Sequence, residues 1–174
     1  MMAGMGGAAA LALGVLGLSG CALASPFAGT GYDEDRGVIN PGAGDRVVVV
    51  ITQAQLGRAD RGEFDDHTRR VIRDLPNHEG YIGHSVRTRV LGDEVWTMTV
   101  WRDEAAMERF VTSPVHSAAI RAGLPAVRRA KFVRESWPAW AVPPTWGQAL
   151  RRLDAEAFVE YGPPGGTDGD APGR

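Results

Sequence analysis

The chain has 174 residues, of which 44% are hydrophobic and 23% charged, a composition typical of a globular protein. Its formal net charge is −2, so nothing in the composition points to general binding of nucleic acid or acidic lipid. The single cysteine, Cys21, excludes an intramolecular disulfide and any metal site built from several cysteines. Glycine and proline concentrate before Asp45 and after Tyr161, which places one domain between two less regular ends.

The first 24 residues contain no charged side chain and resemble an export signal. Ala8 to Leu18 form an apolar run of the length expected for a signal-peptide core. Leu18-Ser19-Gly20-Cys21 is similar to the lipobox of bacterial lipoproteins, where the signal is cut before a cysteine that is then lipidated. Ala22-Leu23-Ala24 would also serve as an ordinary cleavage site. We therefore expect residues 1–24 to direct export or membrane attachment at Cys21.

The alternative is a wrongly assigned start and a cytoplasmic protein, because no Lys or Arg precedes the apolar run. Residues 25–45 are rich in glycine and proline and show no periodic pattern, which predicts a flexible linker.

The predicted domain begins with Arg46 to Thr52, a continuous run of mostly β-branched residues. Apolar residues on both faces indicate a strand that is covered on both sides and central in its sheet. Gly62 to Leu75 predicts the first helix, with an apolar stripe along one side and Pro76 at its end. His67 lies beside this stripe, and we interpret it as a packed or boundary histidine.

Tyr81 to Leu91 and Glu94 to Trp101 predict a hairpin that turns at Gly92-Asp93. In this register His84 lies opposite Trp101. Ile82 falls on the same face as these two, and both faces carry large apolar residues. Both faces must then be covered. Because the predicted helices cover one face, we expect a partner subunit to cover the other.

Two helices separated by a break follow the hairpin. Asp103 is the expected cap of the first helix, and Ser113-Pro114 are expected to begin the second. Arg129 to Trp137 predicts a fourth strand, at the sheet edge and protected by its charges. Thr145 is expected to cap a short helix over Trp146 to Ala157, and the residues from Tyr161 onward predict a disordered tail.

The order of elements predicts an α+β, ferredoxin-like β-α-β-β-α-β fold with an antiparallel sheet. Three motifs are Gly80-Tyr81-Ile82-Gly83, Val100-Trp101-Arg102-Asp103-Glu104-Ala105-Ala106 and Phe110-Val111-Thr112-Ser113-Pro114-Val115-His116. With them, residues 46–137 resemble the dimeric α/β-barrel superfamily and, within it, antibiotic biosynthesis monooxygenase domains. The resemblance implies helices on one sheet face and a homodimer. Residues 138–160 form a C-terminal extension similar to that of a related uncharacterised group in the superfamily.

The resemblance also implies a pocket between the helices and one sheet face, where such proteins often oxidise an aromatic or polyene substrate without metal or flavin. An electron-rich substrate, once deprotonated, reduces oxygen itself, so no cofactor is expected. His84 is the candidate base because it interrupts an apolar and threonine face, and His116 is a second catalytic candidate. Trp101 and Phe110 are the candidate substrate wall, and Gln53 a hydrogen-bond donor to the substrate. The alternatives are a packed or interfacial His84, a structural Trp101 and a surface His116.

Haem degradation is disfavoured by the same resemblance. Haem-degrading members use an Asn on the first strand and a Trp and a His in the second helical region, and Gln53, Phe110 and Ile120 stand at or near those positions here. The histidines show no metal-ligand spacing with carboxylates, and no glycine-rich phosphate loop follows a strand. Two hypotheses remain: a cofactor-independent monooxygenase-like enzyme for a small hydrophobic or aromatic substrate, or a non-catalytic dimeric domain that binds a ligand or serves a structural role.

Overall fold

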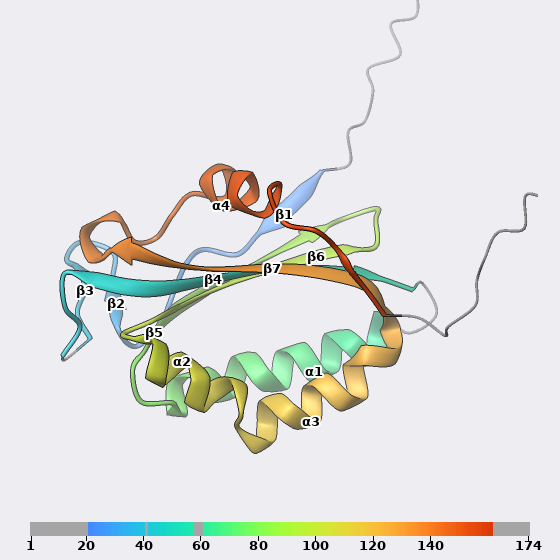
Figure 1. Ribbon diagram of the computed structural model, residues 1–174, viewed down its shortest axis with the longest axis horizontal. Helices are drawn as coiled ribbons and strands as arrows, with labels where there is room; N and C mark the ends of the chain where they lie inside the picture. Colours follow the sequence, from blue (N-terminus) through green and yellow to red (C-terminus); the bar gives the residue numbers. More distant parts are fainter. Residues whose placement is uncertain (1–20, 41, 58–60, 162–174) are drawn as a thin grey trace, which may run out of the picture.

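The computed structural model describes residues 21–40, 42–57 and 61–161. Its centre is a six-stranded antiparallel sheet with strand order β1-β5-β6-β4-β7-β8 (Figure 1). The strands β2 and β3 pair with each other in a separate two-stranded ribbon. The strands are β1 (Ala22–Ala24), β2 (Tyr32–Asp33), β3 (Gly37–Val38), β4 (Arg46–Leu56), β5 (Tyr81–Arg89), β6 (Glu94–Trp101), β7 (Val127–Pro138) and β8 (Val159–Glu160).

Helices lie on both sides of this sheet (Figure 1). The helices α1, α2 and α3 cover one face, and α4 lies on the opposite face. The α+β, ferredoxin-like β-α-β-β-α-β order is confirmed for β4 through β7. None of the helices in the described part of the chain is long and apolar enough to cross a membrane. The helical elements are α1 (Arg61–Asp74), η1 (Leu75–Asn77), α2 (Glu104–Val111), α3 (Pro114–Gly123), η2 (Leu124–Ala126), η3 (Ala139–Ala141) and α4 (Trp146–Leu153).

The helix starts follow from the capping residues in the sequence. Asp103 accepts a hydrogen bond from the backbone N–H of Ala106 at 2.7 Å and begins α2. Ser113 caps α3 in the same way, with proline as the first helical residue. Thr145 and Gln148 form a reciprocal capping box at α4. The caps predicted from sequence at all three helices are confirmed.

The chain itself covers the sheet face opposite α1–α3. Ala149 and Leu153 of α4 are fully buried there, and Phe27 packs against the same apolar cluster. A Cβ at Gly29 would lie 2.2 Å from the carbonyl oxygen of Ile82, so the missing side chain lets this segment lie directly on β5. The described part of the predicted linker, residues 25–40 and 42–45, therefore packs against the sheet, with Phe27, Tyr32, Val38 and Ala43 in contact with its apolar cluster. The uncovered face, which was the sequence-based reason to expect a partner subunit, is not present.

A longer turn and a β-bulge at the start of β5 together change the predicted hairpin register. The strand pairing shifts between Tyr81 and Gly83, and Tyr81, not His84, lies opposite Trp101. His84 pairs with Thr99, because the turn comprises residues 90–93 and not Gly92-Asp93 alone. The bulge also moves Ile82 to the α4 side, where it joins the cluster around Ala149.

Several predictions concern residues at the ends of the chain. Residues 1–20 of the predicted signal and 162–174 of the predicted tail lie outside the described residues. Cys21 is exposed, and Ala22–Ala24, the alternative cleavage site, form β1 against β5. The C-terminal helix ends at Leu153, before the predicted Ala157.

Candidate functional site

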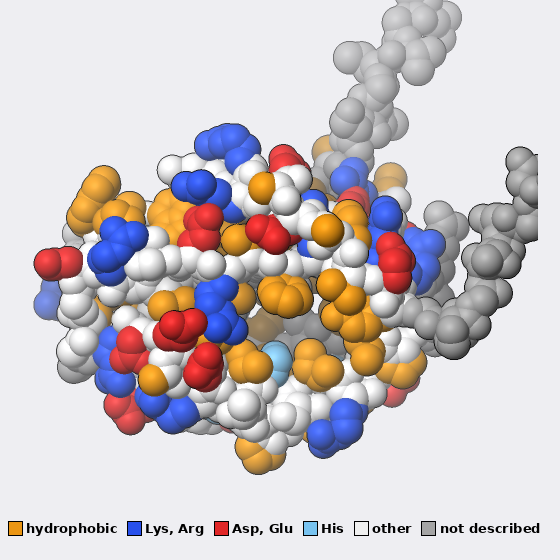
Figure 2. All heavy atoms as spheres, in the orientation of Figure 1, with side chains coloured by type: hydrophobic (Ala, Val, Ile, Leu, Met, Phe, Trp, Pro, Cys, Tyr) orange, Lys and Arg blue, Asp and Glu red, His pale blue; other side chains and the backbone are white. Residues whose placement is uncertain are grey.

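A hollow lies between the middle of the sheet and the helices α1 and α3. On β4 and β6 the helix-facing Val50, Thr52, Thr97 and Thr99 are only half-buried, although residues on either side of them are buried against α4. No residue of α1 is buried. Figure 2 shows the surface hollowed below the sheet, with hydrophobic side chains around the opening and a histidine within it. The helices therefore leave part of the sheet floor open to a ligand.

His84 and Tyr81 form the main polar pair on this side of the sheet. The Tyr81 hydroxyl lies 2.6 Å from Nδ1 of His84 and donates to the carbonyl of Ala28 at 3.3 Å. Burial lowers the pKa of His84 below its usual 6.5, and the hydrogen bond with Ala28 offsets part of that effect. His84 is therefore neutral at pH 7 and can accept a proton.

An aromatic wall is buried between the sheet and α2, on the same side of the sheet as the hollow. The rings of Trp101 and Phe110 stack with centroids 4.8 Å apart and an interplanar angle of 27°. Trp101 is fully buried and donates from Nε1 to the hydroxyl of Thr99 at 3.0 Å, while Tyr81 packs edge-on against it at 5.7 Å. This wall joins β6 to α2 and connects the His84–Tyr81 pair to the helices.

His116 lies on the other side of Phe110, with its ring 4.6 Å from the phenyl ring. Its Nδ1 donates to the carbonyl of Val111 at 2.9 Å, which fixes the tautomer and leaves Nε2 unprotonated. Burial lowers the pKa of His116, the bond to Val111 opposes this, and the nearby His78 lowers the pKa further. His116 is thus a second neutral imidazole beside the aromatic wall.

His78 completes the cluster and forms an acid–base pair. Its Nε2 lies 2.8 Å from Oδ2 of Asp74, and its ring packs edge-on to Phe110 at 5.1 Å. The pKa of Asp74 is lowered, first by a hydrogen bond from Asn77 and then by the bond to His78. The described residues contain no group of three or more His, Cys, Asp or Glu that could hold a metal ion.

The structure brings together four of the five predicted site residues in the domain. His84, Trp101, Phe110 and His116 all lie on the helix side of the sheet. Gln53 does not join them, because it faces the α4 side and donates to Glu94 at 2.9 Å. A strand alternates its side chains, so a residue next to the helix-facing Thr52 must point away from the hollow.

Sequence reasoning missed Tyr81 and His78 as site residues. In a regular strand Tyr81 and His84 would face opposite sides, and only the bulge places them together. The signal that could have indicated it was Gly80-Tyr81-Ile82-Gly83, since glycine within a strand often marks a bulge. His78 stood in a predicted turn, where its pairing with Asp74 was not apparent.

Residues 47–122 match the sequence model of the family described as antibiotic biosynthesis monooxygenase. No curated protein matches the chain. Among solved structures, the chain is similar to FN1347 from Fusobacterium nucleatum, with 14% identity, a TM-score of 0.50, and coverage of 55% of this chain and 46% of that one. A protein from Lactobacillus acidophilus gives 16% identity, a TM-score of 0.48, and coverage of 56% and 49%.

PA3566 from Pseudomonas aeruginosa gives 15% identity, a TM-score of 0.49, and coverage of 53% of this chain and 95% of that chain. The chain spans about half the length of the Fusobacterium and Lactobacillus proteins. At these identities the similarity concerns the fold alone.

Proposed function

Residues 47–122 form an antibiotic biosynthesis monooxygenase-type domain, and on this basis we propose a cofactor-independent monooxygenase-like enzyme for a small hydrophobic or aromatic substrate. The observation that supports the proposal is the hollow on the helix side of the sheet. A neutral histidine, His84, shares this side with the stacked rings of Trp101 and Phe110. An apolar site with a few polar groups is suited to orient an aromatic compound and remove one proton.

The proposed reaction needs only the substrate and oxygen. His84 takes a proton from an activated CH₂ group, and the resulting carbanion transfers one electron to O₂. The substrate radical and superoxide combine to a peroxide, which takes the proton back from His84. Loss of water then leaves a carbonyl, so that CH₂ and O₂ become C=O and H₂O. All four electrons come from the substrate carbon, and no external reductant is consumed.

The proposed role assigns one tautomer to His84, with Tyr81 as its hydrogen-bond partner. In the assigned tautomer, the single hydroxyl proton of Tyr81 is donated to the Ala28 carbonyl at 3.3 Å, and Nδ1 of His84 donates to the hydroxyl oxygen at 2.6 Å. Nε2 of His84 then carries the free lone pair. Burial raises the pKa of Tyr81 to about 12, so the hydroxyl stays protonated at neutral pH. We assign Tyr81 as a positioning residue and not as a base.

The test is oxygen consumption with a panel of phenols, quinols and compounds with an activated methylene group. The wild type is expected to consume oxygen with at least one of them, and His84→Gln to lose about a hundredfold or more in rate. Ser85→Ala is the control, because Ser85 is the next residue on β5 and faces α4. Equal rates for wild type and His84→Gln would contradict the assignment. Saturable binding without oxygen uptake would favour the non-catalytic ligand-binding domain.

The N-terminal segment supports a second, separate proposal, that the chain is exported and lipidated at Cys21. Cys21 is exposed and directly precedes β1. Cleavage before it would keep the pairing of β1 with β5 and the hydrogen bond from Val90 to the Cys21 carbonyl, whereas cleavage after Ala24 would remove β1. Mass spectrometry of the native protein tests this. A mature chain that starts before Cys21, or that carries no lipid, would contradict it.

Homodimer formation also remains a prediction. Its support is the family resemblance alone, since α4 and the described residues between 25 and 45 cover the face where a partner was expected. Sedimentation at micromolar concentration tests it, and a single monomeric species would refute it.

A further inference from the structure

A row of hydrogen-bond donors crosses the α4 side of the sheet. In the strand register Arg87 pairs with Trp96, Trp96 with Gln53, and Gln53 with Lys131. All four side chains face the side away from the hollow. On one side of this row, the same face carries an apolar cluster that includes valine, isoleucine and methionine side chains. The two cations of this row are Arg87 and Lys131. Burying an unpaired charge costs free energy, so we expect a binding partner to compensate for their burial.

Two of these donors are buried without a partner. Trp96 is 5% exposed, and its Nε1–H makes no hydrogen bond with any described residue. The same holds for Nε of Arg87, whose guanidinium lies 5.6 Å from the Trp96 ring. Buried donors are almost always satisfied in folded proteins. An acceptor supplied from outside the chain would satisfy both.

Lys131 adds a buried positive charge. It is 8% exposed, and within the described part of the chain no carboxylate lies within ion-pair distance of its Nζ. Its ammonium group lies 4.8 Å from the ring of Phe158, which also contacts Arg129. The ring offers a weak cation–π contact but no acceptor oxygen.

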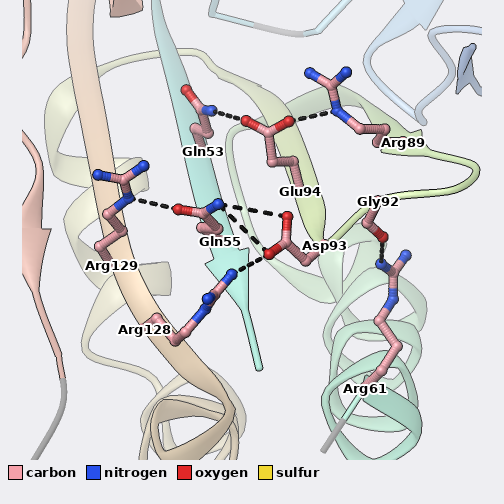
Figure 3. A network of polar contacts seen from close by, with 9 residues as sticks. All are labelled: Gln53, Gln55, Arg61, Arg89, Gly92, Asp93, Glu94, Arg128 and Arg129. Atoms are coloured by element: carbon pink, nitrogen blue, oxygen red, sulfur yellow. Dashed lines mark hydrogen bonds and ion pairs between the residues drawn. The ribbon is translucent and has the colours of Figure 1, made fainter. Parts of the chain in front are cut away.

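Among the described residues, the next row of the sheet forms no ion pair with Arg87 or Lys131. It comprises Arg89, Glu94, Gln55 and Arg129. The row continues onto β8 with Glu160, which pairs with Arg129. Figure 3 shows the other carboxylate, Glu94, between Gln53 and Arg89. One oxygen accepts from Gln53 at 2.9 Å and the other from Arg89 at 2.5 Å. Glu94 is thus fully engaged, and Arg87 and Lys131 are left without an acidic partner from these rows.

We propose that this row is a second ligand site, which binds an oxyanion, a carboxylate or a phosphate group, through Lys131, Arg87 and the Trp96 Nε1–H. An oxyanion supplies several acceptor lone pairs, and each bond to a charged donor is stronger than one between neutral groups. The surrounding Trp96 and Phe158 rings suit an anion that carries an apolar body. The site lies across the sheet from the hollow, so it is independent of the proposed oxidation.

The test is an NMR titration of ¹⁵N-labelled protein at constant ionic strength, set with sodium chloride. The indole N–H signal of Trp96 is assigned with Trp96→Phe. Sodium phosphate and sodium benzoate are the two probes. At least one is expected to shift this signal saturably, and the tighter probe indicates whether the natural ligand is a phosphate or an aryl carboxylate. The absence of a saturable shift with both would overturn the proposal.

Variants distinguish a specific site from general charge. Lys131→Met and Arg87→Met are each expected to weaken binding about tenfold or more. Arg134→Met is the control, because Arg134 lies on β7 but on the other face, paired with Glu104 at 3.1 Å. If Lys131→Met does not fold, the affinity of Arg87→Met for the anion tests the site by itself. Unchanged affinity in the variants, or an equal loss in Arg134→Met, would refute the site. His84→Gln should bind the anion normally, whatever its oxidase activity.

Discussion

Replacing Tyr81 with phenylalanine tests the centre of the candidate site. The substitution removes one oxygen, which lies 2.6 Å from His84 Nδ1 and 3.3 Å from the Ala28 carbonyl. The buried ring and its contact with Trp101 at 5.7 Å remain. Loss of one short and one long hydrogen bond in a buried place predicts a decrease of about 1–2 kcal/mol in the free energy of unfolding.

The pH dependence makes this prediction sharper. Burial raises the pKa of Tyr81 from 10.0 to about 12, so the unfolded chain loses the proton first. The wild type therefore loses stability as the pH rises from 10 towards 12, and Tyr81→Phe does not show this loss. The stability difference between the two proteins should be constant near neutral pH and shrink above pH 10.

Urea denaturation followed by circular dichroism at several pH values measures this difference. Tyr32→Phe is the matched control. The Tyr32 ring packs against Phe27 at 5.0 Å, and its hydroxyl makes no hydrogen bond with a described residue. We expect this control to lie within about 0.5 kcal/mol of the wild type. A Tyr81→Phe protein as stable as the wild type, with the same dependence above pH 10, would refute the buried hydroxyl network.

Three further predictions follow from the same geometry. Gly80→Ala should destabilise by about 2–4 kcal/mol in urea melts, because Gly80 has φ +84° and an added Cβ would lie 2.5 Å from Cβ of Ala106; an effect under about 0.5 kcal/mol would contradict this packing. Gly147→Ala in α4 should instead stabilise by about 0.5–1 kcal/mol, since its nearest neighbour atom lies 3.7 Å away. Because the pKa values of His84 and His116 are lowered, the unfolded chain binds protons first, and stability should fall as the pH drops below 6.5. The double variant with glutamine at both histidines should show a weaker fall in pH-dependent melts, and an unchanged profile would count against their burial.

Much of the fold follows from local patterns in the sequence. The residue types at the helix starts, Asp103, Ser113 and Thr145, act as predicted because capping depends on one side chain and the next turn of backbone. The central position of β4 followed from apolar residues on both faces, and the structure places it between β6 and β7. These predictions need no knowledge of distant contacts.

The candidate site depended on contacts that no local pattern reveals. The bulge after Tyr81 adds one residue to the strand, which reverses the face of Tyr81 and Ile82 and leaves His84 in place. The packing of residues 25–40 on β5 depends on Gly29, where the absent side chain permits a backbone contact. The sequence shows such a glycine but not the strand that it meets.

The polar row on the α4 face could not be predicted from the sequence either, because it also depends on contacts between distant segments. Gln53 and Lys131 are 78 positions apart and become neighbours only through the register of β4 and β7. In the sequence, Lys131 stood among alternating charges typical of a solvated edge strand. The structure buries it because residues after α4, including Phe158, return over β7.

The most direct test of the proposed oxidation is isotope labelling with ¹⁸O₂. The wild type, freed of metal with a chelator and without added flavin, would be incubated with a substrate found in the oxygen-uptake panel. We predict one ¹⁸O atom in the product carbonyl and the other in water, in equal amounts. A product without ¹⁸O, or labelling only after addition of a metal or a flavin, would contradict a cofactor-independent monooxygenase reaction in this domain.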